Sequence, residues 1–103
     1  MTVEKKINGD TLTMVISGRV DSITSQELQT IVESSLDGVA HLILDLAKVE
    51  YVSSAGLRVI LGAHKTMSKQ GTMNLINVPE FVREVFEITG FDSVFNIEYY
   101  LKK

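Results

Sequence analysis

The feature that most constrains the fold is the hydrophobic period of the sequence, which starts as strand alternation and then changes between strand and helix. Residues 3–7 and 11–17 are predicted to be strands, the second because alternate apolar residues share one face. The sequence NGD at 8–10 lies between them and favours a hairpin, since Asn and Gly tolerate positive φ. We therefore expect an antiparallel pair that ends at Gly18, followed by a loop over 19–23.

The middle of the chain reads as helix, strand and helix. Thr24 begins a sequence with the spacing of a capping box, and helical spacing follows until Gly38. Residues 41–46, HLILDL, are a nearly unbroken apolar run, which predicts a strand buried on both faces. A strong helical pattern then covers residues 55–70.

The last third of the chain repeats the alternation. Residues 73–78 are predicted to be an inner strand, and Pro79 suits the first position of a helix that Gly90 ends. A short strand is expected at 94–97, and the tyrosines of the final EYYLKK are expected to pack back on the domain. The inward stripe of the last helix is predicted to be Phe81, Val82, Val85, Phe86 and Ile88.

This order, β-β-α-β-α-β-α-β, defines the expected fold class. Strands that alternate with helices imply crossover connections, and hence a mixed, mostly parallel β-sheet flanked by helices. A length of 103 residues suits a single α/β domain over residues 1–103.

Charge and composition exclude several kinds of partner. The formal net charge of -3 argues against binding to nucleic acid and to anionic membrane surfaces, both of which require a basic face. The absence of cysteine excludes disulfides and thiolate metal sites. The first ten residues lack the apolar region of a secretory signal, so we expect a cytoplasmic protein without a membrane partner. A monomer is the default expectation.

Catalysis needs a set of residues that the sequence does not supply. A serine nucleophile requires a base, and His64 lies ten residues beyond Ser54, which is about 15 Å along a helix. His41 opens a strand, and neither histidine belongs to a metal-binding motif. Asp21 and Asp45 could form a carboxylate pair, but Asp21 is better explained as a turn former and Asp45 as a polar strand end. We expect no enzyme activity, no cofactor and no metal.

The helix predicted at 55–70 has more apolar surface than one sheet contact requires. Its apolar residues cover an arc of roughly 200°, whereas docking on a single sheet needs about 100°. A neighbouring helix explains most of the excess and is the favoured interpretation. The alternative is a partner site at the first turn, where Ala55, Gly56 and Leu57 would form a shallow apolar floor.

Two serines and a glycine lie at the start of this helix, in the sequence YVSSAGLR at 51–58. One serine is explained as an N-cap, which typically contributes about 0.5–2 kcal/mol. Gly56 costs up to about 1 kcal/mol in the first turn, and close approach by another molecule would explain it. A phosphate on Ser54 would meet free amides and the positive end of the helix dipole, so the fold would tolerate it.

These residues carry a family resemblance that covers nearly the whole chain. The segment LILDLAKVEYVSSAGLRVIL, preceded by ISGRVDSITSQEL, resembles the STAS domains, and specifically the anti-sigma factor antagonists. The resemblance implies a mixed sheet flanked by helices. It also implies binding to an anti-sigma factor that is an ATP-dependent serine kinase, with release of the sigma factor. The kinase would then phosphorylate the chain, and a metal-dependent serine phosphatase would reverse the modification.

The resemblance also implies which residues form the site. Ser54 matches the phosphorylated serine, and Asp21 matches an acidic loop residue near it. Members of the family often carry Asp where this chain has Ser53, so Ser53 is a rival acceptor. The alternative function is a STAS interaction module without a phosphoserine switch, in a signalling scaffold or a lipid-transport complex. The implied partner-binding residues are Asp21, Ser22, Ser53, Ala55, Gly56, Leu57 and Arg58.

Overall fold

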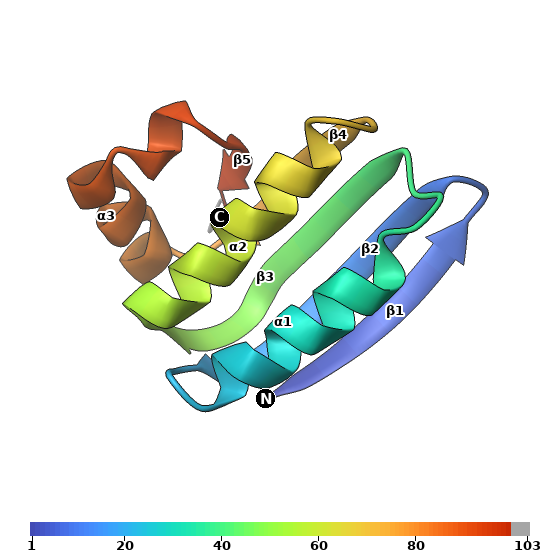
Figure 1. Ribbon diagram of the computed structural model, residues 1–103. Helices are drawn as coiled ribbons and strands as arrows, with labels where there is room; N and C mark the ends of the chain where they lie inside the picture. Colours follow the sequence, from blue (N-terminus) through green and yellow to red (C-terminus); the bar gives the residue numbers. More distant parts are fainter. Residues whose placement is uncertain (100–103) are drawn as a thin grey trace.

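The strands lie in the sheet in the same order as in the sequence, β1-β2-β3-β4-β5. The computed structural model describes residues 1–99, and the predicted order of elements is confirmed within them. The elements are β1 Thr2–Asn8, β2 Thr11–Val20, α1 Thr24–Ser35, β3 His41–Val52, α2 Ser54–Met67, β4 Thr72–Val78, α3 Glu80–Thr89, the 3₁₀ turn η1 Phe91–Ser93 and β5 Asn96–Tyr99 (Figure 1).

The sheet is mixed, as predicted. β1 and β2 are antiparallel, whereas β2, β3, β4 and β5 are parallel to one another. The hairpin between β1 and β2 pairs Asn8 with Thr11, and Gly9 has a φ of 62° in the turn. This is the positive φ for which the NGD sequence is suited.

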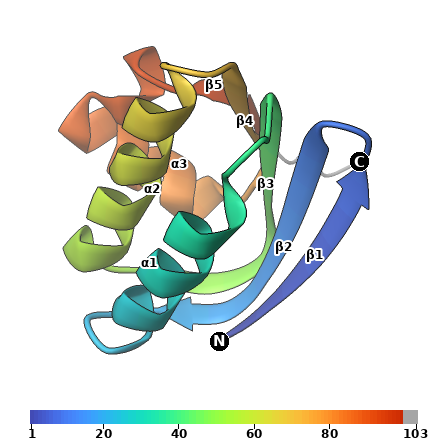
Figure 2. The same cartoon turned by 45° about the vertical axis from the view of Figure 1, so that its right-hand side comes forward.

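The helices cover one face of the sheet, and the prediction that residues 41–46 are buried on both faces is wrong (Figures 1 and 2). Leu42, Leu44 and Leu46 are buried under the helices, but Ile43 and Asp45 face the other side and are half-buried. The reason is the strand order. Each right-handed crossover steps in the same direction across the sheet and therefore places its helix on the same face.

Two strands run further than the sequence predicts. β2 continues past Gly18 to Val20, so part of the loop expected at 19–23 is strand. Gly18 pairs with Val49 and Val20 with Val52, with register shifts on both sides of Gly18, which has a φ of 91°. Both shifts place the extra residue in β3, and β2 keeps its alternation, with Ile16 and Val20 buried on the same face. The pattern appears to stop because Gly18, at the inward position between them, has no side chain.

Asp45 is correspondingly not the end of its strand. Its carboxylate accepts hydrogen bonds from the backbone amide of Ala47, at 3.0 Å, and from the side-chain amide of Asn77, at 3.2 Å. Asn77 has a φ of 55°, which is unusual for a residue other than glycine. Asp45 therefore connects β3 to the irregular end of β4 and has a structural role.

The second helix, α2, packs against α1 and lies between α1 and α3, so the neighbouring-helix interpretation is confirmed for most of its length (Figure 1). Val59 and Ala63 are buried. On its other side, the ring of His64 packs edge-on against Phe95, with 5.5 Å between centroids. The apolar arc of α2 is thus covered from two directions by the chain itself.

The third helix, α3, buries fewer residues than predicted. Val82 and Phe86 face the core, and Phe86 packs against Phe95. Phe81 and Ile88 point outward, with 39% and 86% of their surfaces exposed, so their assignment to the inward stripe is wrong. Val85 is half-buried and packs against the core, which fits the position of α3 at the far edge of the sheet (Figure 1).

The ends of α3 and β5 also shift slightly from the prediction. Pro79 is the N-cap of α3 and lies just before its first residue. β5 begins at Asn96, two residues later than expected, because η1 occupies residues 91–93. Tyr99 is half-buried and contacts Arg83 of α3, as expected for one tail tyrosine. The expectation for Tyr100 lies outside the described residues.

Candidate functional site

Two turns meet at the sheet edge where the parallel strands β2 and β3 end. The first is the β2–α1 turn over residues 21–23, and the second is the junction of β3 and α2 at Ser53. The backbone amide of Ser53 donates a hydrogen bond to the carbonyl of Val20 at 2.8 Å. The carboxyl ends of neighbouring parallel strands are a common place for binding sites, and the predicted site residues from both segments gather here.

Ser53 is the residue that caps α2. It has an extended backbone, with φ -85° and ψ 172°, and its hydroxyl accepts a hydrogen bond from the amide of Gly56 at 3.2 Å. This is the arrangement of an N-cap, in which a side-chain oxygen satisfies an amide of the first turn. The sequence left open which serine caps the helix, and the geometry assigns that role to Ser53.

Ser54 is the first residue of α2 and is exposed. Its amide and that of Ala55 belong to the first turn, whose N–H groups have no partner within the helix. Within residues 1–99, the Ser54 hydroxyl meets no hydrogen-bond partner. A group attached to this oxygen would therefore lie in solvent at the positive end of the α2 dipole.

Gly56 is required by the packing of the chain on itself. A Cβ atom at this position would lie 2.8 Å from Cγ1 of Val20 and 3.1 Å from the Val20 carbonyl oxygen. Gly56 and Leu57 are both buried, so they offer no surface to another molecule. Ala55 is half-buried and Arg58 is exposed. The accessible part of the predicted floor is therefore narrower than the sequence indicated.

Asp21 stabilises the β2–α1 turn by hydrogen bonds to backbone amides. The sequence predicts that a capping box starting at Thr24 binds amides at the start of the helix. Its Oδ1 accepts hydrogen bonds from the amides of Ile23, at 3.0 Å, and Thr24, at 2.9 Å. The amide of Asp21 in turn donates to Oγ1 of Thr24 at 2.9 Å. The prediction that Thr24 caps the helix from outside is wrong, because α1 begins at Thr24 and its side chain faces back into the turn.

These hydrogen bonds lower the pKa of Asp21. The amide of Thr24 has the largest effect, followed by the amide of Ile23. The charged carboxylate thus stabilises the turn and keeps Ser22 and Ile23 on the surface. Ile23 is 79% exposed and is not among the predicted site residues. Its only sequence signal is an apolar residue inside a polar turn.

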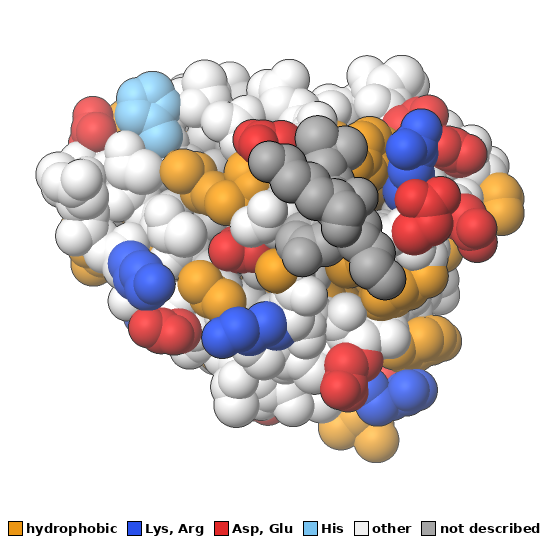
Figure 3. All heavy atoms as spheres, turned by 180° about the vertical axis from the view of Figure 1, so that it is seen from behind, with side chains coloured by type: hydrophobic (Ala, Val, Ile, Leu, Met, Phe, Trp, Pro, Cys, Tyr) orange, Lys and Arg blue, Asp and Glu red, His pale blue; other side chains and the backbone are white. Residues whose placement is uncertain are grey.

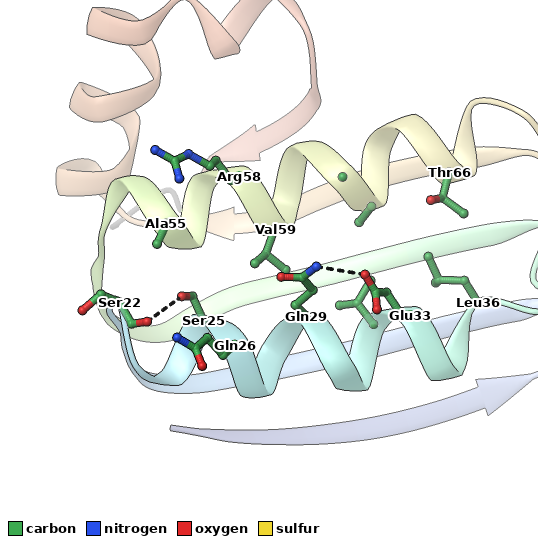
Figure 4. A pocket seen from close by; sticks show the side chains of 13 residues that line it. Ser22, Ser25, Gln26, Gln29, Glu33, Leu36, Ala55, Arg58, Val59 and Thr66 are labelled. Atoms are coloured by element: carbon green, nitrogen blue, oxygen red, sulfur yellow. Dashed lines mark hydrogen bonds between the residues drawn. The ribbon is translucent and has the colours of Figure 1, made fainter.

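A groove of about 640 Å³ runs between α1 and α2 and opens beside this site (Figure 4). Ser22 and Ala55 lie at one end of the groove, and Leu36 and Thr66 lie at the other (Figure 4). The Arg58 side chain extends along α2 toward the end where Ala55 lies (Figure 4). Arg58, Ser22 and Ala55 are thus accessible together around the start of α2.

The other candidate residues do not join this site. The Nδ1 atom of His41 lies 2.8 Å from Oγ1 of Thr72, on the uncovered face of the sheet. His64 contacts Phe95 further along α2. Across residues 1–99, His, Asp and Glu side chains form no group of three that could hold a metal ion. No helix in that part of the chain is long and apolar enough to span a membrane.

Comparison with known proteins links this geometry to a family. The family model for the STAS domain matches residues 2–103. BtrV of Bordetella bronchiseptica, provisionally named an anti-sigma factor antagonist, is 39% identical over 94 residues, which cover 89% of this chain and 80% of that protein. The anti-sigma-B factor antagonist of Bacillus subtilis is 30% identical over 98 residues, covering 94% and 90% of the two chains.

A solved structure supports the fold independently. The Bacillus cell fate determinant SpoIIAA in its phosphorylated form aligns with a TM-score of 0.74, covering 93% of this chain and 90% of that chain. The sequence identity is 16%, so this likeness bears on the fold alone.

Proposed function

Because the chain belongs to the STAS domain family, we propose that it is an anti-sigma factor antagonist that phosphorylation of Ser54 switches off. Its relatives in Bordetella and Bacillus carry that functional name. The observation that most supports the switch is that the two serines have different roles. Ser53 caps α2, whereas Ser54 presents a free hydroxyl at the first helical position.

In this proposal the unphosphorylated chain binds an anti-sigma factor and thereby releases the sigma factor in the cytoplasm. The anti-sigma factor docks around the start of α2, on Ser54, Ala55 and Arg58, and on Ser22 of the adjoining turn. Ser22, Ser54 and Arg58 are exposed and Ala55 is half-buried, which, together with the fixed turn that Asp21 maintains, supports this choice of surface. Gly56 and Leu57 are buried beneath this surface and contribute indirectly, by fixing the shape of the first turn of α2.

The partner is proposed to be an ATP-dependent serine kinase as well. The hydroxyl oxygen of Ser54 attacks the γ-phosphorus of ATP, ADP leaves, and the hydroxyl proton passes to a base of the kinase. A metal-dependent phosphatase reverses the step by attack of water on the phosphoserine, with release of inorganic phosphate. The phosphate adds about -1.5 to -2 charge to the docking surface, which opposes capture.

The fold is expected to survive this modification. A phosphate at Ser54 lies next to the unpaired amides of the first turn, where negative charge is favourable. Arg58 is one helical turn further on, at the i+4 position, and extends toward the same end of α2 (Figure 4). The charge would therefore act on the partner and would not unfold the helix.

The test uses the ATP-binding anti-sigma factors encoded in the same genome. We expect incubation with ATP and the cognate factor to place phosphate on Ser54, as mapped by mass spectrometry. Ser54→Ala should bind the factor without being released, and Ser54→Asp should bind it at least tenfold more weakly. Ser68→Asp is the matched control, since it adds the same charge at the other end of α2.

Two results would count against the proposal. Phosphate on Ser53 alone would move the acceptor by one residue. Unchanged binding by both Ser54 variants, without phosphate on either serine, would favour the alternative function of a STAS module without a switch.

A further inference from the structure

The outer surface of α3 carries an apolar stripe that residues 1–99 cover only in part. Phe81, Val85 and Ile88 recur at i, i+4 and i+7, which places them on one side of the helix. Ile88 is 86% exposed and Phe81 is 39% exposed, while Val85 is half-buried. The stripe is about 10 Å long by helical rise. The helix itself, α3, begins near the start of α2 and runs away from it (Figure 1).

A row of carboxylates borders this stripe. At 100° per residue, Glu80, Glu84 and Glu87 lie about 60–120° from Phe81, on the side opposite to the core-facing residues. All three are exposed. Acidic and hydrophobic side chains accordingly gather together at the edge of the molecule where α3 lies (Figure 3). The stripe therefore lies between the core contact and an acidic margin.

The one basic residue of α3 does not neutralise this margin. The guanidinium of Arg83 forms an ion pair with Glu87 at 2.9 Å and lies 4.8 Å from the centroid of the Tyr99 ring. Glu80 and Glu84 remain free of salt bridges within the described residues, and Asp92 of η1 adds another exposed carboxylate nearby. The local surface is thus apolar in its centre and acidic along its side.

We propose that Phe81, Val85 and Ile88 form a docking face for a basic amphipathic helix of another protein. Such a helix places its apolar residues on the stripe and its Lys or Arg residues opposite Glu80 and Glu84. Charge selects this partner over a second copy of the chain. A symmetric antiparallel contact between two α3 helices would bring the acidic margins against each other, which is unfavourable.

This docking face is distinct from the surface proposed around Ser54. Its occupation depends on apolar contact and on the carboxylates of α3, neither of which changes when Ser54 is modified. The chain would then hold one partner constantly and another according to the state of Ser54. If Ser54 proves not to be a switch, this inference is unaffected. If the α3 face binds no partner, the proposal for Ser54 is likewise unaffected.

The test uses two synthetic peptides of about fourteen residues. Both carry leucine at i, i+4 and i+7 of a helix, and their remaining positions are mostly Lys in one peptide and mostly Glu in the other. Each is titrated into the ¹⁵N-labelled full chain and followed by NMR. We expect the Lys peptide to shift amide signals of residues 80–89, with an affinity that falls severalfold between low and moderate salt. The Glu peptide should cause no such shifts.

Matched variants distinguish binding at this face from non-specific binding of the peptide. Ile88→Ser should weaken the Lys peptide about tenfold, the equivalent of about 1.4 kcal/mol. Ile7→Ser removes an isoleucine that is 78% exposed on β1 and should leave binding unchanged. Glu84→Lys should weaken binding of the Lys peptide. Glu50→Lys makes the same change in net charge at an exposed position of β3 and should have a smaller effect.

Three outcomes would overturn the inference. One is a set of shifts located on another surface, such as the groove between α1 and α2. Another is equal binding of the two peptides or of the Ile88 and Ile7 variants. The last is concentration-dependent self-association of the chain in analytical ultracentrifugation that Ile88→Ser abolishes, because the face would then bind a second copy.

Discussion

The hydroxyl of Ser53 accepts a hydrogen bond from the backbone amide of Gly56 at 3.2 Å, and this bond closes the first turn of α2. Ser54, which follows Ser53 in the sequence, takes no part in it. The two serines therefore differ in what they contribute to stability, although they are the same residue type one position apart.

Replacing each serine by alanine should show this difference. Ser53→Ala removes the cap and should lower the free energy of unfolding by about 1 kcal/mol. Ser54→Ala removes an exposed hydroxyl and should change it by less than about 0.5 kcal/mol. Urea denaturation followed by circular dichroism measures both. Equal losses in the two variants would contradict the assignment of Ser53 as the cap.

Two glycines of α2 should respond to alanine in opposite directions. Gly56→Ala would place a Cβ 2.8 Å from Val20, and we expect a loss of about 1–3 kcal/mol from overpacking. Gly62→Ala meets nothing within 4 Å and should gain about 0.5–1 kcal/mol from helix propensity. Thermal unfolding of the two variants measures the contrast. If Gly56→Ala were as stable as wild type, packing against Val20 would not explain the glycine. Close approach of a partner protein would then be the better explanation.

Aspartate at the two ends of α2 should also act in opposite directions. Ser54→Asp puts a negative charge at the N-terminus and should raise the free energy of unfolding by about 0.3–1 kcal/mol at low salt. Ser68→Asp puts it at the C-terminal cap and should lower stability, partly because the hydroxyl of Ser68 also donates to the Lys65 carbonyl. The Ser54 gain should shrink in high salt. A gain that is independent of salt would point to a cause other than charge.

Asp21 should make the stability of the domain sensitive to acid. Its pKa is lowered in the folded state from an ordinary value of 3.8, chiefly by the amides of Thr24 and Ile23. The stabilisation is therefore complete above the ordinary pKa and is lost as pH falls through the folded pKa. The difference in urea midpoint between wild type and Asp21→Asn should be constant near neutrality and shrink below about pH 4. A difference that persists unchanged at pH 2 would show that ionisation of Asp21 is not involved.

The order and type of the elements could be predicted because hydrophobic period is a local property of the sequence. The errors arise where structure depends on distant segments. The end of β2 was placed at Gly18 because glycine supplies no apolar side chain to continue the alternation, and only pairing with β3 carries the strand to Val20. Residues 41–46 seemed buried on both faces because Ile43 is apolar, but the strand order leaves its side of the sheet uncovered.

The site was predictable in its position and less so in its details. Two serines before a helix indicated a cap and a spare hydroxyl, and both roles are present in the structure. The role of Gly56 depends on how closely Val20 approaches it, which no local pattern reveals. Asp21 was predicted to be a turn former, and it accepts hydrogen bonds from the amides of Ile23 and Thr24. The capping box at Thr24 is absent because α1 already begins at that residue.

The agreement between strand order and chain order has a consequence for assembly of the domain. Each new strand adds to the free edge of the strands that precede it, and no strand has to enter between two that are already paired. During synthesis on the ribosome, the sheet can thus form by adding each new strand to the same free edge. The last strand to be added is β5, which follows α3 in the chain.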